Sequence, residues 1–153
     1  MGVLKRHDGQ EPGRESWSVM QGLHDGKPLV ARINQGAGSL AGDPNHNIRV
    51  GVAIPVHNPD RNGFPEAAEL EMLASFEDAL VKRTGQHATL VAVLTTRAMR
   101  EFVLYTGSAE WIAAAHSDLR ALLPTHEVQM VADLDPAWST YRYFSEAIAG
   151  ERA

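Results

Sequence analysis

Residues 48–56 alternate between apolar and other side chains, and this pattern constrains the fold more than any other part of the chain. One face of the segment would carry Ile48, Val50, Val52, Ile54 and Val56. A period of two predicts a β-strand with one buried face. Because a proline has no N–H for a sheet ladder, Pro55 predicts that regular pairing ends near Ile54.

The elements after this strand follow in the order helix, strand, strand, helix, strand. Apolar residues at helical spacing predict helices over 65–84 and 108–123, the first opened by Pro65 and the second capped by Ser108. Apolar runs predict strands over 89–95, 100–105 and 127–132. This is the order of the ferredoxin-like split βαβ fold, an α+β sandwich with an antiparallel sheet and two helices on one face.

Further elements are expected on either side of this core. Residues 17–22 and 29–33, joined by turn residues, predict an added N-terminal β-hairpin, and residues 135–148 predict a C-terminal aromatic helix. Residues 1–15 lack periodicity and are expected to be a mobile leader, so that a single domain spans 16–148. Residues 34–47 predict a loop. Its glycines, Gly36, Gly38 and Gly42, do not lead into a helix as those of a dinucleotide-binding loop would.

The strand 89–95 is expected at the edge of the four-stranded core sheet, although it is apolar on both faces. Leu90, Ala92 and Leu94 would share one face, and Val91 and Val93 the other. An exposed apolar edge promotes aggregation, so something must cover it. Pairing or stacking of the N-terminal hairpin and association with a second copy are both open.

Composition excludes several classes of function. The 153 residues fit one domain, and their net charge of −5 argues against binding to duplex nucleic acid. The absence of cysteine excludes disulfides, thiolate metal sites and cysteine catalysis. No segment resembles a secretory signal or a membrane span, so we expect a cytoplasmic protein without a membrane partner.

No residue spacing points to a metal, a cofactor or a catalytic group. The seven histidines lack the spacing of zinc ligands, and the chain has no Gly-x-Ser-x-Gly nucleophile motif. Recognition of single-stranded RNA is not expected either, because Phe102 and Tyr105 would lie on opposite faces of their strand.

Glu77 is the most unusual polar residue, because it falls within the apolar stripe of the first helix. A carboxylate that faces a core must be paired or protonated. It is expected either to form a structural ion pair, for example with Arg97 or Arg100, or to serve as a general base or ligand contact.

Several motifs together resemble a known family. They include Gly63-Phe64-Pro65, Arg100-Glu101-Phe102 with Tyr105-Thr106, and Asp135-Pro136 with Trp138 and Tyr141. Over about residues 17–144 the chain resembles the bacterial domain-of-unknown-function family 695. The C-terminal motif is also similar to that of the regulator of ribonuclease activity B family, whose members are ferredoxin-like and bind a ribonuclease. The resemblance implies the fold and no assigned activity. Ala98-Met99 stands where such sequences often have a glycine, which leaves the turn type open.

These observations predict a small cytoplasmic binding or regulatory module that acts through an unidentified protein partner or as a homodimer. Its expected contact surfaces are the sheet face away from the helices and the edge of strand 89–95. The alternative is a small-ligand-binding protein or an enzyme with a site near Glu77, Arg100 and His57. A pocket with convergent polar groups would favour the alternative, and a flat apolar patch would favour the module. The candidate binding residues are Glu77, Arg100, Glu101, Tyr105, Asp135, Trp138 and Tyr141.

Overall fold

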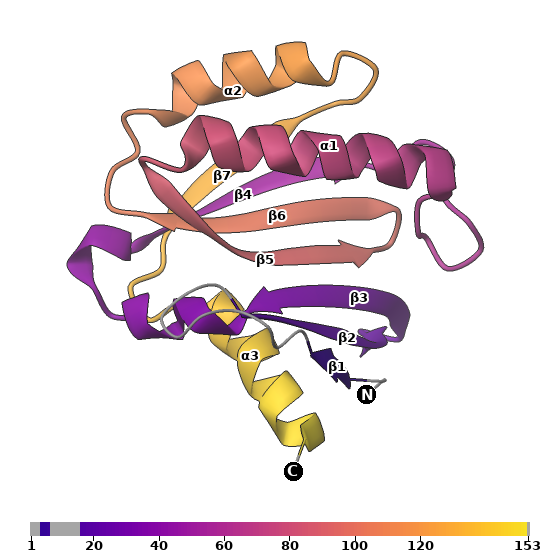
Figure 1. Cartoon of the computed structure of the whole chain (residues 1–153), viewed down its shortest axis with the longest axis horizontal. Coiled ribbons are helices and arrows are strands. Elements are labelled where there is room, and N and C mark those ends of the chain that lie inside the picture. Colours follow the sequence, from indigo (N-terminus) through magenta and orange to yellow (C-terminus); the bar gives the residue numbers. More distant parts are fainter. Residues whose placement is uncertain (1–3, 7–15, 153) are drawn as a thin grey trace.

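The computed structural model describes residues 4–6 and 16–152. Within these residues the strands form one antiparallel seven-stranded sheet in the order β1-β2-β3-β5-β6-β4-β7 (Figure 1). The strands are β1 (Leu4–Arg6), β2 (Trp17–His24), β3 (Lys27–Asn34), β4 (Ile48–Pro55), β5 (Ala88–Thr96), β6 (Met99–Thr106) and β7 (Gln129–Leu134). The helices are α1 (Ala67–Thr84), α2 (Ile112–Leu122) and α3 (Ser139–Arg152), with short 3₁₀ helices η1 (Gln35–Leu40) and η2 (Pro44–His46).

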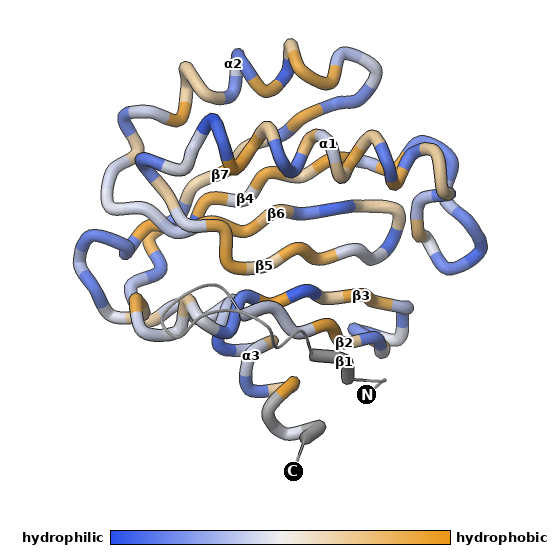
Figure 2. Tube along the Cα trace, in the orientation of Figure 1, coloured by the Kyte–Doolittle hydropathy of each residue, from blue (hydrophilic) through white to orange (hydrophobic). Residues whose placement is uncertain are grey.

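The ferredoxin-like prediction is confirmed for β4-α1-β5-β6-α2-β7. β4 and β6 lie at the centre of this core, with β5 beside β6 and β7 beside β4. Val50, for example, pairs with Leu104 of β6 and with Ala132 of β7. Both crossover helices cover the same face, where buried residues of α1, α2 and the central strands form one apolar core. Hydrophobic and hydrophilic positions alternate along α1 (Figure 2), and its Leu73, Phe76 and Leu80 are buried.

The N-terminal hairpin extends the sheet by pairing with β5. Its turn has two residues, Asp25 and Gly26, both at positive φ, as a tight hairpin requires. Ala31 of β3 lies opposite Leu94 of β5, so β5 has neighbours on both sides. The expectation that the edge of strand 89–95 is a contact surface is therefore wrong. Among the described strands, β7 and β1 are the free edges. Of the predicted leader, residues 4–6 form β1 and the rest lies outside the described residues.

A second apolar core lies on the opposite face of the sheet, under α3 and η1. Aromatic residues of α3 and its approach pack there against β3, β5 and β6. No described residue of β4 or β7 belongs to this core, so α3 covers only part of the face. The sheet face away from the crossover helices, expected as a contact surface, is thus partly covered by α3.

The structure differs from the predicted pattern inside β5. Pairing with β6 shifts between Leu90 and Ala92, which indicates a β-bulge. Val91 and Ala92 both join the core under α3, while Leu90 and Val93 face the crossover helices. The predicted division of this strand into faces is therefore wrong beyond the bulge.

Both crossover helices begin later than the sequence predicts, because local contacts take the place of the first helical turn. Pro65 makes an isolated bridge with Pro59, so α1 begins at Ala67 instead of at the proline. The hydroxyl of Ser108 accepts from the N–H of Glu110, and α2 begins only at Ile112. The predicted loop 34–47 contains η1 and η2.

Candidate functional site

A cavity of about 650 Å³ lies between the N-terminal part of α3 and the sheet, and we name it the α3-face cavity. Leu94 and Phe144 belong to its apolar lining, and Ser139 and Thr140 contribute hydroxyls from the first turn of α3. The remaining lining residues are His24, Asp25, Leu29, Arg49, Thr96, Met99, Glu101 and Tyr143. Four segments that are distant in sequence thus meet around one hollow.

Glu101 of β6 contributes a largely buried carboxylate to the α3-face cavity. Its side chain is 30% exposed, and an oxygen of its carboxylate lies 3.6 Å from Nη1 of Arg49, beyond hydrogen-bond range. Burial raises the pKa of Glu101 above its ordinary value, although the charge of Arg49 acts in the opposite direction. The guanidinium of Arg49 donates instead to Asp133, at 3.1 Å from Nη2.

Gly51 of β4 makes room for this carboxylate. A Cβ at position 51 would lie 2.5 Å from Oε2 of Glu101, which no side chain tolerates without movement. A glycine inside a central strand weakens the strand and marks a close approach. The glycine therefore lets Glu101 lie flat against the sheet at the side of the cavity.

The lining combines negative charge with aromatic surface. Asp25 and Glu101 bring carboxylates to the lining and Arg49 a guanidinium, and Asp25 also pairs with Arg97 outside the lining, at 3.5 Å. His24 contacts the rings of Tyr143 and Phe144 at centroid distances of 5.7 and 6.0 Å. Such a lining can hold a small molecule that has a cationic or hydrogen-bond-donating end and an apolar body.

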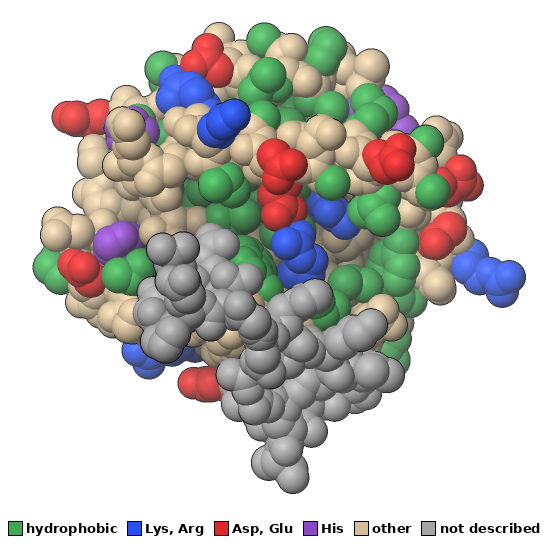
Figure 3. All heavy atoms as spheres, in the orientation of Figure 1, with side chains coloured by type: hydrophobic (Ala, Val, Ile, Leu, Met, Phe, Trp, Pro, Cys, Tyr) green, Lys and Arg blue, Asp and Glu red, His purple; other side chains and the backbone are tan. Residues whose placement is uncertain are grey.

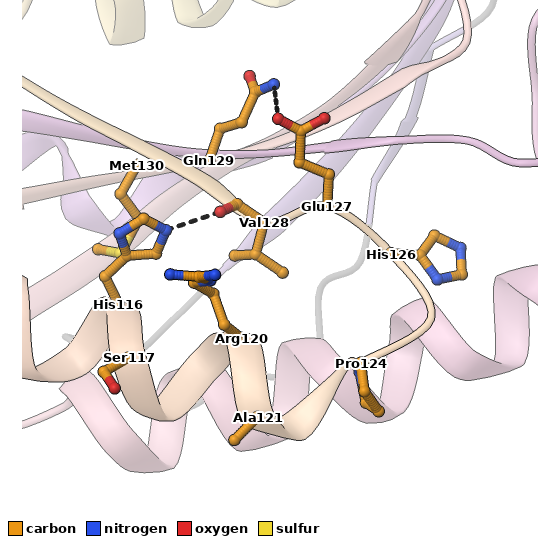
Figure 4. A pocket seen from close by; sticks show the side chains of 10 residues that line it. All are labelled: His116, Ser117, Arg120, Ala121, Pro124, His126, Glu127, Val128, Gln129 and Met130. Carbon is orange, nitrogen blue, oxygen red and sulfur yellow. Dashed lines mark hydrogen bonds between the residues drawn. The ribbon is translucent and has the colours of Figure 1, made fainter.

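A second hollow, of about 810 Å³, lies between α2 and the segment that enters β7. His116 and Arg120 extend from α2 toward this segment, and Nε2 of His116 lies 2.7 Å from the carbonyl oxygen of Val128 (Figure 4). The Gln129 amide donates to Glu127 along the same segment. His126 lies apart from these residues in the view, at the far end of the lining (Figure 4).

His126 takes part in a polar cluster with His57 and Glu69. The Glu69 carboxylate accepts from the backbone N–H groups of His57 and Asn58, at 2.7 and 3.2 Å. Nε2 of His126 lies 2.7 Å from the same carboxylate. Burial alone would raise the pKa of Glu69, but these hydrogen bonds together hold it below its ordinary value. Glu69 thereby ties the loop after β4 to the loop before β7.

Glu77 and Arg100 lie near each other on the helix-covered face, as the sequence suggested, but the direct partner of Glu77 is Arg32. Both Glu77 oxygens accept from the Arg32 guanidinium, at 2.8 and 3.2 Å. Arg100 is only 9% exposed, and its Nε has no hydrogen-bond partner among the described residues. Burial lowers the pKa of Arg100, which the charge of Glu77 opposes and that of Arg32 reinforces. Between the hairpin and α1 the surface is hollowed, and charged and hydrophobic side chains meet there (Figure 3).

The C-terminal candidates hold α3 against the sheet. Tyr105 and Trp138 are fully buried and stack at 4.1 Å, and Tyr141 meets Trp138 edge-on at 5.2 Å. The Tyr105 hydroxyl donates to Asp135 at 2.7 Å, and burial raises the pKa of this phenol strongly. The Tyr141 hydroxyl donates to the carbonyl of Asn34 at 2.8 Å. These contacts place the four residues in packing between α3 and the sheet, outside both hollows.

The comparisons with known proteins identify the family. Residues 15–145 match the sequence model of a family described as "Family of unknown function (DUF695)". The chain belongs to this family. No curated protein and no solved structure matches it. The similarity of the C-terminal motif to the regulator of ribonuclease activity B family has no support from these comparisons. Within the described residues, no helix is long and apolar enough to cross a membrane.

The predicted site residues thus fall into separate places. Glu101 lines the α3-face cavity, while Glu77 and Arg100 lie on the other side of the sheet and His57 belongs to the cluster with Glu69. Arg49, Ser139 and Thr140 could not be named from the sequence, because only the tertiary fold brings them to the same cavity as Glu101. Gly51 within an otherwise alternating strand was the available signal.

Proposed function

We propose that this member of the DUF695 family is a small-molecule-binding protein whose site is the α3-face cavity. The observation that carries the proposal is the half-buried Glu101 carboxylate beside an apolar lining. A partly desolvated carboxylate without a hydrogen bond from the described residues is stabilised by a ligand that brings a positive charge or donors.

The chemistry of the lining selects the ligand class. An amine or guanidine on an aromatic or aliphatic body would face Glu101, while the body would lie against Leu94 and Phe144. The hydroxyls of Ser139 and Thr140 would orient further polar groups. The Glu101 carboxylate disfavours an anionic ligand of the same shape, because like charges repel.

Benzylamine is a suitable probe, with benzyl alcohol and benzoate as ligands of similar shape and different charge. We expect benzylamine to shift the backbone amide resonances of Glu101, Thr140 and Phe144 in a saturable way, and benzoate to shift them least. Affinity for the amine should rise with pH as Glu101 ionises, because its raised pKa keeps part of the population neutral in acid.

Two substitutions separate the site from the fold. Glu101→Gln should weaken benzylamine binding at least tenfold and leave benzyl alcohol unchanged, whereas Glu127→Gln, an exposed change on another face, should alter neither. Gly51→Ala should also weaken benzylamine binding, because the added methyl group displaces the Glu101 carboxylate. Equal binding of benzoate and benzylamine, or shifts outside the lining, would contradict the proposal.

A second candidate function is association with a protein, including a second copy. The free edge strand β7 favours it, since Val131 and Leu134 are 55% and 77% exposed there. Native mass spectrometry of untagged protein tests this candidate. A dimer that Val131→Lys dissociates would support it, and a monomer of wild-type protein that co-purifies with no other protein would contradict it.

A further inference from the structure

Three side chains that can ligate a metal meet at one end of the sheet. His57 follows β4, Glu69 lies in the first turn of α1, and His126 precedes β7. One ligand atom of each lies within 4.8 Å of those of the other two. The sequence gives no sign of this grouping, because the loops after β4 and before β7 converge only in the folded chain.

Two of the three groups are already fixed in position. The Glu69 side chain is 9% exposed, and two backbone N–H groups hold its oxygens. The His126 side chain is 2% exposed, with Thr125 Oγ1 at 2.8 Å from Nδ1 and Glu69 at 2.7 Å from Nε2. Outer hydrogen bonds of this kind orient ligands in metal sites and strengthen their binding.

His57 supplies the adjustable third group. Its ring stacks on that of His126, at a centroid distance of 3.8 Å and an interplanar angle of 8°. Imidazole lone pairs lie in the plane of the ring, so two stacked rings do not aim at a common point. His57 is exposed, however, and a rotation of its side chain would turn a ring nitrogen toward Glu69 and His126.

We propose that His57, Glu69 and His126 bind one divalent transition-metal ion of the zinc type. Two imidazoles and one carboxylate form a ligand set used by catalytic zinc sites, which keep a fourth position for water or substrate. The nitrogen ligands favour Zn²⁺ or Co²⁺ over Mg²⁺ and Ca²⁺, which prefer oxygen. The metal would take the place of the contact between Nε2 of His126 and the Glu69 carboxylate, while Nδ1 of His126 can keep the ring proton toward Thr125 Oγ1. The site lies apart from the α3-face cavity and does not depend on its function.

The test is titration of the full-length, metal-free protein with Zn²⁺ by calorimetry and with Co²⁺ by visible absorption. We expect one Zn²⁺ per chain and d–d bands of Co²⁺ with nitrogen ligands. Ca²⁺ and Mg²⁺ at the same concentrations should produce no binding heat. Zn²⁺ added afterwards should still produce its full heat of binding.

His57→Ala is the decisive variant, because this exposed side chain can be removed without opening the core. It should weaken Zn²⁺ binding on the order of 100-fold. His126→Gln should weaken Zn²⁺ binding to a similar extent, while the side-chain amide of the glutamine can still donate to Glu69. His116→Gln is the matched control, since the His116 ring is hydrogen-bonded within the chain, as the His126 ring is, but lies outside the cluster. The Zn²⁺ affinity of the His116→Gln variant should stay within about threefold of that of the wild type.

Three outcomes would overturn the proposal. One is the absence of Zn²⁺ binding to a chain whose circular dichroism shows it folded. Another is unchanged binding in His57→Ala. The last is equal weakening by His57→Ala and His116→Gln, which would indicate scattered adventitious coordination by surface histidines.

Discussion

At the residue scale, the turn between β5 and β6 is built from unusual residues. Arg97 and Ala98 have φ angles of 54° and 61°, in the left-handed region that favours glycine. The question of turn type that Ala98 raised is thereby answered: the link is a tight two-residue turn. The turn is held by neighbours, since Ala98 N donates to Gly63 O at 3.1 Å and its carbonyl accepts from Val56 N at 2.8 Å.

Replacing the strained alanine should stabilise the protein. We expect Ala98→Gly to raise the free energy of unfolding by about 0.5–1 kcal/mol, because a left-handed alanine costs more than the added flexibility of glycine. Urea denaturation measures the change. Ala74→Gly, on the exposed side of α1, should have the opposite sign, with a loss of about 1 kcal/mol. A loss of stability in both variants would show that the turn is unstrained.

Glu77 and Glu71 lie on the same helix in different surroundings. Glu77 binds Arg32 in a bidentate pair beside the buried Arg100, whereas Glu71 is exposed. Glu77→Leu leaves two guanidiniums without their carboxylate, so it should destabilise the protein by about 2 kcal/mol more than Glu71→Leu. Thermal melts of the two variants make the comparison, and equal melting temperatures would refute a buried structural role for Glu77.

Glu101 predicts a pH effect of defined sign. Burial raises its pKa in the folded state, so the folded chain holds this proton longer than the unfolded chain does. The stability that neutral Glu101 contributes is fully present below the pKa of this group in the unfolded chain. It is lost as the pH rises through the higher pKa of the folded chain. Glu101→Gln stays neutral, so its stability relative to wild type should increase from acid to neutral pH. Thermal melts across this range, with Glu127→Gln as control, test the sign.

At the element scale, α3 depends on a few anchoring contacts at its start. Trp138 has a positive φ of 55° and is fully buried, and its indole N–H donates to the carbonyl of His46 at 2.6 Å. Asp135 caps the helix by accepting from the Ser139 N–H and hydroxyl, and it also accepts from Tyr105. The aromatic helix was predicted from its composition, but this anchoring depends on contacts with distant segments.

Removal of the cap should loosen the whole helix. Burial would raise the pKa of Asp135, but its hydrogen bonds from Ser139 and Tyr105 hold it below its ordinary value. Asp135→Ala should therefore cost about 1–2 kcal/mol at neutral pH. The difference from wild type should shrink as pH falls through the lowered pKa. Asp133→Ala, an exposed change nearby, should cost less. A similar loss in both variants, measured by urea unfolding, would contradict the capping role.

Elements with a regular hydrophobic period could be predicted from the sequence, whereas irregular positions within them could not. The alternation in 48–56 identified β4, and the order of the elements that follow it identified the ferredoxin-like core. The bulge after Leu90 was not predictable, because Val91 and Ala92 are both apolar and either face accepts them. Of the candidate site, Glu101 could be named from its motif. Its partners in the cavity come from α3, β4 and the hairpin turn, and no local pattern connects them.

At the scale of the whole molecule, the sheet has a protected centre and an exposed end. β5 and β6 have a paired strand on each side and an apolar core on each face. β7 pairs only with β4, and most of its residues are exposed. Amide hydrogen exchange should therefore be slowest in β5 and β6 and faster in β7. Uniform protection of all three strands in the free protein would contradict this order and would indicate that a partner chain covers β7.

The pairing of β3 with β5 has a consequence for synthesis on the ribosome. The hairpin precedes its partner strand in the chain, and this strand follows only after β4 and α1 have been made. Until then, Ala31 and Ile33 face solvent on a nascent chain that cannot bury them. The α3 segment, which follows all of these strands in the chain, then closes the second core over them. A chain released before α3 would keep this apolar face open, which makes truncated products targets for chaperones and proteases.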